Sequence, residues 1–240
     1  MRKTGLCFGV AAIFALSVAT TCAFAQDKPI KIGGLFPMSG PGFYFGVQDK
    51  QGIELALEEV NKTGVNGYKL EIQYEDSACS PLPATQAAKR LLDQYKPQIA
   101  LGEECSDATL AIMPLMDEAK VPFLNAGSSA ALGYVRIVQF DPTDRRELVA
   151  NFVRSFKAKY NQEPTHLNAH AYDQIILIAD VVRRGGKDSQ SIRDTLAATK
   201  NFSGVTGSVE FDAHNQNIRM DTIHYMETLP DLSWKALAWN

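Results

Sequence analysis

The sequence predicts an α/β fold whose core is a parallel β-sheet. Between Lys28 and Leu124, four β-rich runs alternate with three amphipathic stretches. Strands that alternate with helices form parallel sheets, because each helix carries the chain back across the sheet by a right-handed crossover. The strand runs are nearly continuous in apolar residues, as expected where helices cover both faces of a sheet.

The first expected helix has the clearest apolar spacing. Ile53, Ala56, Leu57 and Val60 recur at the i, i+3, i+4 and i+7 positions of one buried helix face. A Gly/Pro-rich loop, Pro37 to Gly46, is expected before it. The expected strands are Ile30–Phe36, Tyr68–Tyr74, Ile99–Leu101 and Val121–Leu124, and two further helices run from Pro81 or Pro83 to about Tyr95 and from Asp107 to Ala119.

Beyond residue 134 the pattern changes to consecutive helices followed by short strands. The expected helices are Asp144–Tyr160, Ala169–Arg184 and Ser189–Thr199. The second is apolar nearly all round, which favours a helix packed between two layers. The expected β runs are Val135–Phe140, the segment GVTGSVEFD, and, after a turn at HNQN, Ile218–Met226 and Lys235–Trp239.

The N-terminus is typical of an export signal. Arg2 and Lys3 precede an apolar stretch, Leu6 to Val18, that is too short to span a bilayer. The sequence Ala-Phe-Ala that follows predicts cleavage after Ala25. The alternative is a lipoprotein that is acylated at Cys22.

Charge and cysteine content narrow the possible partners. The chain has 24 Lys and Arg against 27 Asp and Glu, and its net charge of −3 becomes more negative once the signal is removed. This balance argues against nucleic acid or an anionic membrane surface as a partner. Cys79 and Cys105 remain in the exported chain, and an even pair in an oxidising compartment predicts a disulfide worth about 3 kcal/mol. Two buried free thiols are the alternative.

A ligand site is expected at the carboxyl ends of the parallel strands. Three loops leave that edge: Pro37 to Gly46, Glu103 to Asp107 and Asn125 to Gly133. Ser106 begins a helix in the second loop, where its hydroxyl and free backbone N–H groups can hold a carboxylate. Its alternative role is that of an N-cap.

The other two loops add contacts of different kinds. Gly127 lets a ligand approach the backbone, and Ser129 adds a hydroxyl. The aromatic run that ends at Phe45 offers an apolar wall to a ligand side chain, or else covers the end of the sheet. His166 and His170 share a helix face but have no nearby carboxylate, so they are a weak candidate for a metal site. The sequence predicts neither catalytic nor cofactor-binding residues.

With these residues in place, the chain resembles the periplasmic leucine/isoleucine/valine-binding protein family, the solute receptors of branched-chain amino acid ABC importers. The resemblance rests on the following motifs: IKIGGLFPMSGPGFYFG, GIELALEEVNKTGVNGYKLEIQYEDSAC, GEECSDAT, VPFLNAGSSA, FDPTDRRELVANFVRSFKAKYNQEPTHLNAHAYDQIILIADVVRRGG and NFSGVTGSVEFD. It implies a disulfide between Cys79 and Cys105, and ligand contacts from Phe45, Ser106, Gly127, Ser129 and Tyr172, the last in the family's Tyr-Asp helix start.

The family has two α/β lobes, and most of the second is missing from this sequence. Roughly 100–150 residues, the size of a domain, are absent between Gly133 and Val135. The resemblance therefore implies one Rossmann-like lobe of a type 1 periplasmic binding protein and a small antiparallel β remnant. The implied divisions are a signal peptide (1–25), the N-terminal part of the first lobe (26–134), a remnant strand (135–140), the C-terminal helices and strand of the first lobe (141–211) and a remnant β-hairpin (212–240).

The resemblance implies a periplasmic binding protein rather than an enzyme. Its expected ligand is a branched-chain amino acid or related small carboxylate, and its expected partner is an inner-membrane ABC permease. Loss of the second lobe removes the ligand's ammonium contact, so weakened binding is expected. The alternative is an internally deleted remnant, or an interaction module without a transport role. The remnant strands are expected to pair with one another in a monomer, or with a second chain in a weak dimer.

Overall fold

The computed structural model describes residues 28–125, 136–138, 140–211, 224–228 and 234–237. The main sheet consists of β1 (Ile30–Phe36), β2 (Leu70–Asp76), β3 (Ile99–Gly102) and β4 (Phe123–Asn125). The helices of this half are α1 (Phe43–Thr63), α2 (Pro81–Arg90) and α3 (Ser106–Ala119), with η1 (Gly40–Gly42) before α1 and η2 (Leu91–Tyr95) after α2. The later elements are β5 (Arg136–Val138), α4 (Glu147–Tyr160), α5 (His166–Arg183), α6 (Ser189–Ala197), β6 (Phe202–Gly204), β7 (Gly207–Val209), β8 (His224–Thr228) and β9 (Trp234–Leu237).

The main sheet is parallel, with the strand order β2-β1-β3-β4. In its centre Ile32 pairs with Ile72 on one side and with Ile99 on the other. The predicted α/β class and the four parallel strands are therefore confirmed. The strand order reverses between β1 and β3, and the crevice at such a reversal is where α/β sheets bind ligands.

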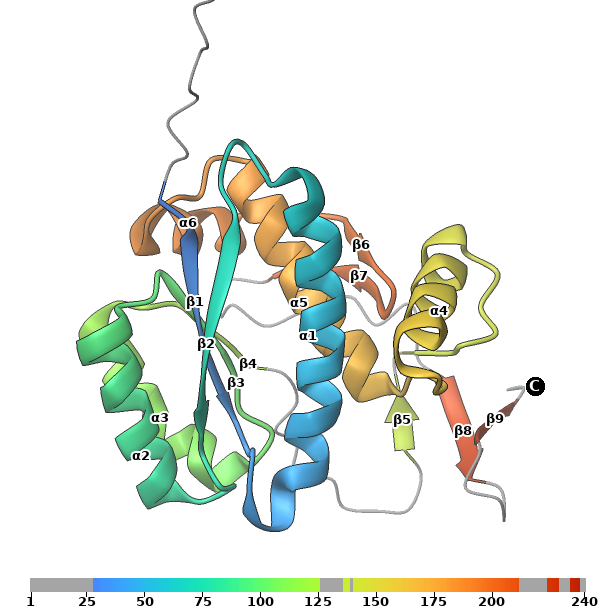
Figure 1. Cartoon of the computed structure of the whole chain (residues 1–240), viewed down its shortest axis with the longest axis horizontal. Coiled ribbons are helices and arrows are strands. Elements are labelled where there is room, and N and C mark those ends of the chain that lie inside the picture. The colour runs from blue at the N-terminus through green and yellow to red at the C-terminus, as the bar shows by residue number, and fades with distance from the viewer. Residues whose placement is uncertain (1–27, 126–135, 139, 212–223, 229–233, 238–240) are drawn as a thin grey trace, which may run out of the picture.

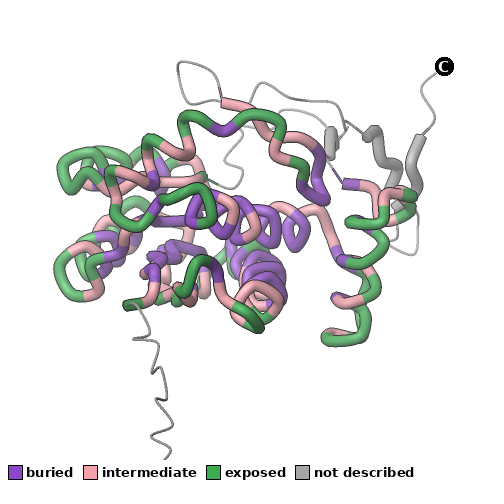
Figure 2. Tube along the Cα trace, turned by 90° about the horizontal axis from the view of Figure 1, so that it is seen from above, coloured by how far each residue is buried: buried purple, intermediate pink, exposed green. Residues whose placement is uncertain are grey.

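Helices cover both faces of this sheet (Figure 1). Side chains alternate across a strand, so Leu35 packs with α2 and α3 while its neighbour Phe36 packs with α1 and α5. All but the edges of the sheet are buried, and the buried part of the trace gathers between the helical layers (Figure 2). Burying one such large apolar side chain contributes about 1.5–3 kcal/mol. The apolar runs of the sequence thus determine both layers.

The packing of α1 on α5 brings two backbones unusually close. A Cβ atom on Gly52 would lie 2.1 Å from the carbonyl oxygen of Asn168, so only glycine fits at this crossing. The Asn168 side chain donates a hydrogen bond to the carbonyl oxygen of Gln48 on α1 (2.7 Å). Asn168 also completes a capping box with Thr165 at the start of α5.

Three helix starts differ from the predictions by three or four residues, and α3 begins one residue before the predicted Asp107. The first helix begins at Phe43, before the end of the predicted loop, because Gly46 packs on the carbonyl oxygen of Pro37 instead of making a turn. The helix predicted from Asp144 begins at Glu147, since the Asp144 carboxylate accepts hydrogen bonds from the Arg146 N–H (2.8 Å) and its guanidinium (2.7 Å) in a local turn. The helix predicted from Ala169 begins at His166, where the capping box places it.

The short strands of the second half form two antiparallel groups. β6 pairs with β7, while β5, β8 and β9 form a sheet in the order β5-β8-β9. The predicted pairing of the remnant strands with one another is therefore confirmed for their described parts. Phe140 does not join them: it is 2% exposed and packs in the main core, with its ring 5.6 Å from that of Phe152. Val135 lies outside the described residues.

Candidate ligand-binding site

The carboxyl ends of β1 and β3 lead directly into α1 and α3 at one edge of the sheet (Figure 1). Ser106 is the first residue of α3 and is half-buried there. The N-cap is Cys105, whose side chain makes no capping hydrogen bond, so Ser106 does not have the alternative role of an N-cap. The N–H groups of the first helical turn and the helix dipole favour an anion at this position.

The predicted aromatic wall lies at the start of α1. Phe43, Tyr44 and Phe45 are 52%, 58% and 37% exposed, so they do not cover the end of the sheet. The rings of Tyr44 and Phe45 pack edge to face, with their centroids 6.2 Å apart. Exposed aromatic rings beside a helix N-terminus can bind a molecule that has one anionic end and one apolar end.

Gly127 and Ser129, the predicted contacts from the third loop, lie outside the described residues. The end of β4 just before them is fixed by Asn125. Its amide nitrogen donates hydrogen bonds to the carbonyl oxygen of Glu103 (2.9 Å) and to the hydroxyl of Thr109 (3.3 Å). This asparagine therefore links the third loop to the loop that carries Ser106. The sequence analysis missed this contact, although an asparagine that follows a buried strand was visible.

The first loop is held by Asp76 at the end of β2. Its carboxylate accepts hydrogen bonds from the N–H groups of Met38 (2.8 Å) and Ala78 (2.8 Å) and from the hydroxyl of Ser39 (2.6 Å). Burial raises the pKa of Asp76, but these hydrogen bonds outweigh it and hold the pKa below its usual value. The carboxylate stays ionised at neutral pH and fixes the loop that leads into α1.

The Cys79–Cys105 disulfide is formed, with the Cα atoms 5.4 Å apart. It joins the loop after β2 to the residue that precedes Ser106. The disulfide predicted from the sequence is present in the structure, and the alternative of two free thiols is not.

Loss of this disulfide is expected to destabilise the protein. The variant in which Cys79 and Cys105 are both replaced by Ser should lose about 3 kcal/mol in free energy of unfolding, because the unfolded chain is no longer cross-linked. Chemical denaturation of both proteins after periplasmic expression measures the difference. Intact mass that shows two free thiols in the unmodified chain would contradict the prediction.

Tyr172 is not placed with Phe45 and Ser106. It is 5% exposed, stacks on Phe152 with centroids 4.7 Å apart, and donates a hydrogen bond to Glu59 (2.5 Å). Glu59 lies 14 residues beyond Phe45 on α1, which is about 21 Å along the helix axis. Tyr172 therefore packs between α1 and α5. It lies away from the sheet edge where Phe45 and Ser106 are found.

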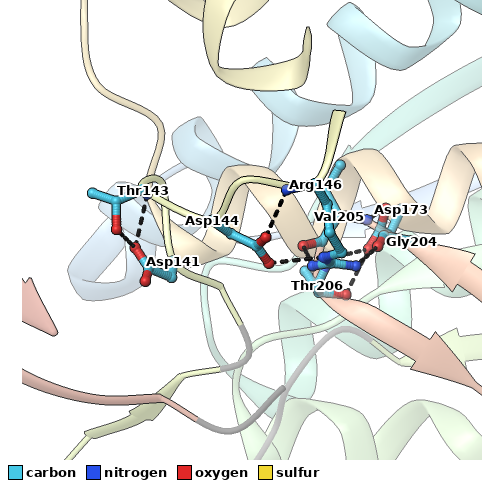
Figure 3. Close-up of polar contacts among 8 residues, drawn as sticks. All are labelled: Asp141, Thr143, Asp144, Arg146, Asp173, Gly204, Val205 and Thr206. Atoms are coloured by element: carbon cyan, nitrogen blue, oxygen red, sulfur yellow. Dashed lines mark hydrogen bonds and ion pairs between the residues drawn. The ribbon is translucent and has the colours of Figure 1, made fainter. Parts of the chain in front are cut away.

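Asp173, the neighbour of Tyr172, anchors the β6–β7 hairpin (Figure 3). Its carboxylate accepts hydrogen bonds from the N–H groups of Val205 and Thr206 (both 2.8 Å) and from the Thr206 hydroxyl (2.5 Å). Burial raises the pKa of Asp173 to about 6, and the hydrogen bonds and the charge of Arg146 oppose that rise. No Cβ atom fits at Gly204, where it would lie 2.3 Å from this carboxylate.

Arg146 contacts the same hairpin from the segment that returns from β5. Its guanidinium donates to the carbonyl oxygens of Gly204 and Val205 (both 3.0 Å) and pairs with Asp144 (2.7 Å), as Figure 3 shows. Arg146 and Asp173 together hold the β6–β7 hairpin against α5 and the segment that precedes α4. No spacing pattern in the sequence points to this contact between Arg146 and the hairpin.

Two cavities lie away from these residues. One of about 610 Å³ is lined by residues of α3, β4 and α6, including Met116, Phe123 and Leu196, and one of about 360 Å³ lies between α1 and α4. Neither is lined by Phe45 or Ser106.

The two histidines that were weighed as metal ligands lie with their ring planes perpendicular, 6.5 Å apart between centroids. His170 is half-buried, and desolvation lowers its pKa to about 4, so its ring is neutral at physiological pH. In the described parts of the chain, no group of three or more His, Cys, Asp or Glu could hold a metal ion. No helix among the described residues is long and apolar enough to cross a membrane.

The sequence of this chain is similar to those of known binding proteins. Residues 29–133 match the model of a periplasmic binding protein family. An amino acid binding protein of Pseudomonas aeruginosa is 34% identical over 129 residues, which are 53% of this chain and 33% of that protein. The Leu/Ile/Val-binding protein of Citrobacter freundii is 26% identical over 227 residues, which are 90% of this chain but 58% of that protein.

The fold matches a solved structure of the same kind. The branched-chain amino acid substrate-binding protein LivJ of Streptococcus pneumoniae, solved with isoleucine, superposes with a TM-score of 0.77 at 20% identity, in an alignment that spans 87% of this chain and 99% of that chain. These findings confirm the resemblance to the branched-chain amino acid periplasmic binding protein family and its type 1 fold. The chain spans about a third of the length of the first curated relatives that it matches.

Proposed function

We propose that this protein is the substrate-binding component of an ABC importer and binds branched-chain amino acids or related small carboxylates. The observation that carries the proposal is the position of Ser106 as the first residue of α3, in a loop that Asn125 ties to the end of β4 and the Cys79–Cys105 disulfide ties to the loop after β2. Curated relatives named as amino acid and Leu/Ile/Val-binding proteins support it. Its role is binding rather than catalysis.

The contacts follow from the chemistry of the edge. The ligand carboxylate accepts hydrogen bonds from the Ser106 hydroxyl and from the free N–H groups of the first turn of α3. The apolar side chain packs on Phe45, and Gly127 and Ser129 of the third loop complete the carboxylate contacts. Tyr172 acts only through the packing of α5, because its hydroxyl is already bonded to Glu59.

Export and delivery complete the proposed role. The signal peptide is removed after Ala25, the mature chain works in the periplasm, and it passes its ligand to an inner-membrane permease. Residues 26–134 and 141–211 form the binding lobe, while 135–140 and 212–240 are what is left of the second lobe. Without that lobe, nothing pairs with the ligand's ammonium group, and binding is weaker than in two-lobed relatives.

The substitution Ser106→Ala tests the site. Affinity for a small carboxylate should fall by about 1–3 kcal/mol, the value of a hydrogen bond to a charged group. A thermal-shift screen against amino acids and organic acids identifies the ligand, and an NMR titration then measures both affinities.

The matched control is Ser80→Ala. Ser80 precedes α2 at the same edge and likewise makes no side-chain capping hydrogen bond. This variant should bind the ligand as the unmodified protein does. Equal affinities of the Ser106→Ala variant and the unmodified protein would place the site elsewhere.

The second candidate function is that of an internally deleted remnant or interaction module. It is favoured by the Citrobacter freundii match, which extends over 90% of this chain but over only 58% of the relative. Genes for a permease beside the coding sequence, intact and co-transcribed, support the transport role. Decayed neighbours support the remnant.

A further inference from the structure

Three carboxyl groups meet in the interior beside the candidate site. Asp49 on α1 is 0% exposed, Glu103 in the loop after β3 is also 0% exposed, and Glu104 next to it is half-buried. No group among the described residues donates a hydrogen bond to either carboxylate oxygen of Asp49 when the acids of this cluster are ionised. No ion pair in the described part of the chain involves any of the three acids.

The carboxyl groups of Asp49 and Glu104 lie within hydrogen-bonding reach of each other, and Asp49 Oδ1, Asp49 Oδ2 and Glu104 Oε1 have no other hydrogen-bond partner among the described residues. Two ionised carboxylates only repel, and neither can donate, so this contact requires that at least one of them carries a proton. The Cys105 N–H donates to Glu103 (3.0 Å), and the Ser77 side chain also bonds to Glu103. Glu103 therefore has partners of its own, and the shared proton belongs to Asp49 and Glu104.

Among the described residues, the groups around the pair supply no positive charge. From β2, Tyr74 faces Asp49, and burial raises the pKa of its hydroxyl, so it stays neutral. Lys50 lies over the Tyr74 ring, 5.3 Å from its centroid, and pairs with Glu54 (3.7 Å) rather than with Asp49. Asp76, also on β2, adds a negative charge near Glu103.

Burial and mutual repulsion shift the titration of the pair. Burial raises the pKa of Asp49 well above its usual value, and the charge of Glu104 raises it further. Burial also raises the pKa of Glu104, and with the charge of Glu103 it reaches about 7. The pair therefore takes up a proton as the pH falls through about 7 and releases it as the pH rises.

We propose that Asp49 and Glu104 form a proton-linked latch that holds the start of α1 against the β3–α3 loop and loosens as the pH rises through neutral. Asp49 lies four residues after Phe45, on the same face of α1, and Glu104 lies two residues before Ser106. The latch thus sets the distance between the aromatic wall and the helix N-terminus. This last consequence rests on the proposed function, whereas the latch itself does not.

The direction of the effect follows from proton linkage. The usual values are 3.8 for Asp and 4.5 for Glu, and both groups are raised above them in the folded protein. Folding therefore takes up protons between those values and the folded-state pKa. The stability that the pair contributes is fully present at low pH and is lost as the pH rises through about 7.

The latch is tested by urea denaturation of the unliganded mature chain at roughly pH 5.5 and pH 8.5. These buffers lie roughly one and a half pH units to either side of the titration of the pair. The urea midpoint should fall between the two conditions. Asp49→Asn and Glu104→Gln each mimic a protonated member, so each variant should lose most of this fall and have a higher midpoint than the unmodified chain in the alkaline buffer.

Glu118→Gln is the matched control, because Glu118 is exposed on α3 and should leave the fall unchanged. Comparing variants with the unmodified chain cancels the titration of His170 and Asp173, which contribute equally to all four proteins. The latch proposal would be overturned if the Asp49→Asn and Glu104→Gln variants kept the whole fall in urea midpoint. It would also be overturned if the midpoint of the unmodified chain did not fall. Because no ligand is present, neither outcome depends on whether the proposed binding function is correct.

Discussion

Asp173→Ala is expected to lower the free energy of unfolding by about 3–5 kcal/mol, the range for breaking a buried charged network from one side. The substitution leaves the N–H groups of Val205 and Thr206 and the Thr206 hydroxyl without their acceptor. Val205 and Thr206 are 1% and 7% exposed, so water cannot readily replace the carboxylate. Each buried donor left unpaired costs about 1–3 kcal/mol.

A second aspartate on the same helix provides the control. Asp180 pairs with Arg183 (3.4 Å) and Arg184 (2.7 Å), and its side chain is 29% exposed. Asp180→Ala should therefore cost at most about 1 kcal/mol, as is usual for surface ion pairs. Urea denaturation measures both variants. Equal losses for Asp173→Ala and Asp180→Ala would mean that the hairpin is not held by Asp173.

Gly102→Ala should be similarly damaging, at about 3–5 kcal/mol, because strain and overpacking coincide at this residue. A Cβ atom there would lie 1.8 Å from the carbonyl oxygen of Leu35 on the neighbouring strand, and the residue has φ +119°. The end of β3 would have to move away from β1. Because Glu104 and Ser106 follow directly, the candidate site should be disturbed along with the sheet.

The substitution Gly67→Ala separates the cost of backbone strain from the cost of overpacking. Gly67 also has a positive φ, +85°, but an added Cβ atom would meet nothing within 4 Å. It should cost only the conformational strain, about 1–2 kcal/mol. Thermal unfolding of both variants gives the comparison. A Gly102→Ala variant no less stable than Gly67→Ala would show that β1 and β3 are not in the contact described.

The apolar spacing of the sequence predicts the elements well and their starts poorly. Ile53 and its partners on one helix face identify α1, because burying such a face drives packing on the sheet. The start of that helix depends instead on Gly46 meeting Pro37, and the start of α5 depends on the capping box of Thr165 and Asn168. These are contacts of particular atoms, which periodicity does not reveal.

The residues of the candidate site likewise fall into those that the sequence predicts and those that it does not. Ser106 could be predicted because it follows a buried strand, and parallel strands bring their carboxyl ends to one edge. The proximity of Asp49 and Glu104 could not be, since these residues are distant in sequence and no spacing pattern links them. The bond from Asp173 to the hairpin spans 32 residues for the same reason. The resemblance implies a ligand contact from Tyr172, whereas in the structure its hydroxyl donates a hydrogen bond to Glu59.

Isothermal titration calorimetry of the mature chain with leucine, isoleucine and valine measures what a single lobe can bind. We expect saturable binding that is much weaker than micromolar, because the carboxylate is held at Ser106 while the ammonium group finds no partner. Each 1.4 kcal/mol lost is about a tenfold loss of affinity, and an unpaired charge that must be desolvated costs several kcal/mol. Sub-micromolar binding of any of the three amino acids would contradict the proposed loss of affinity that follows from the missing second lobe.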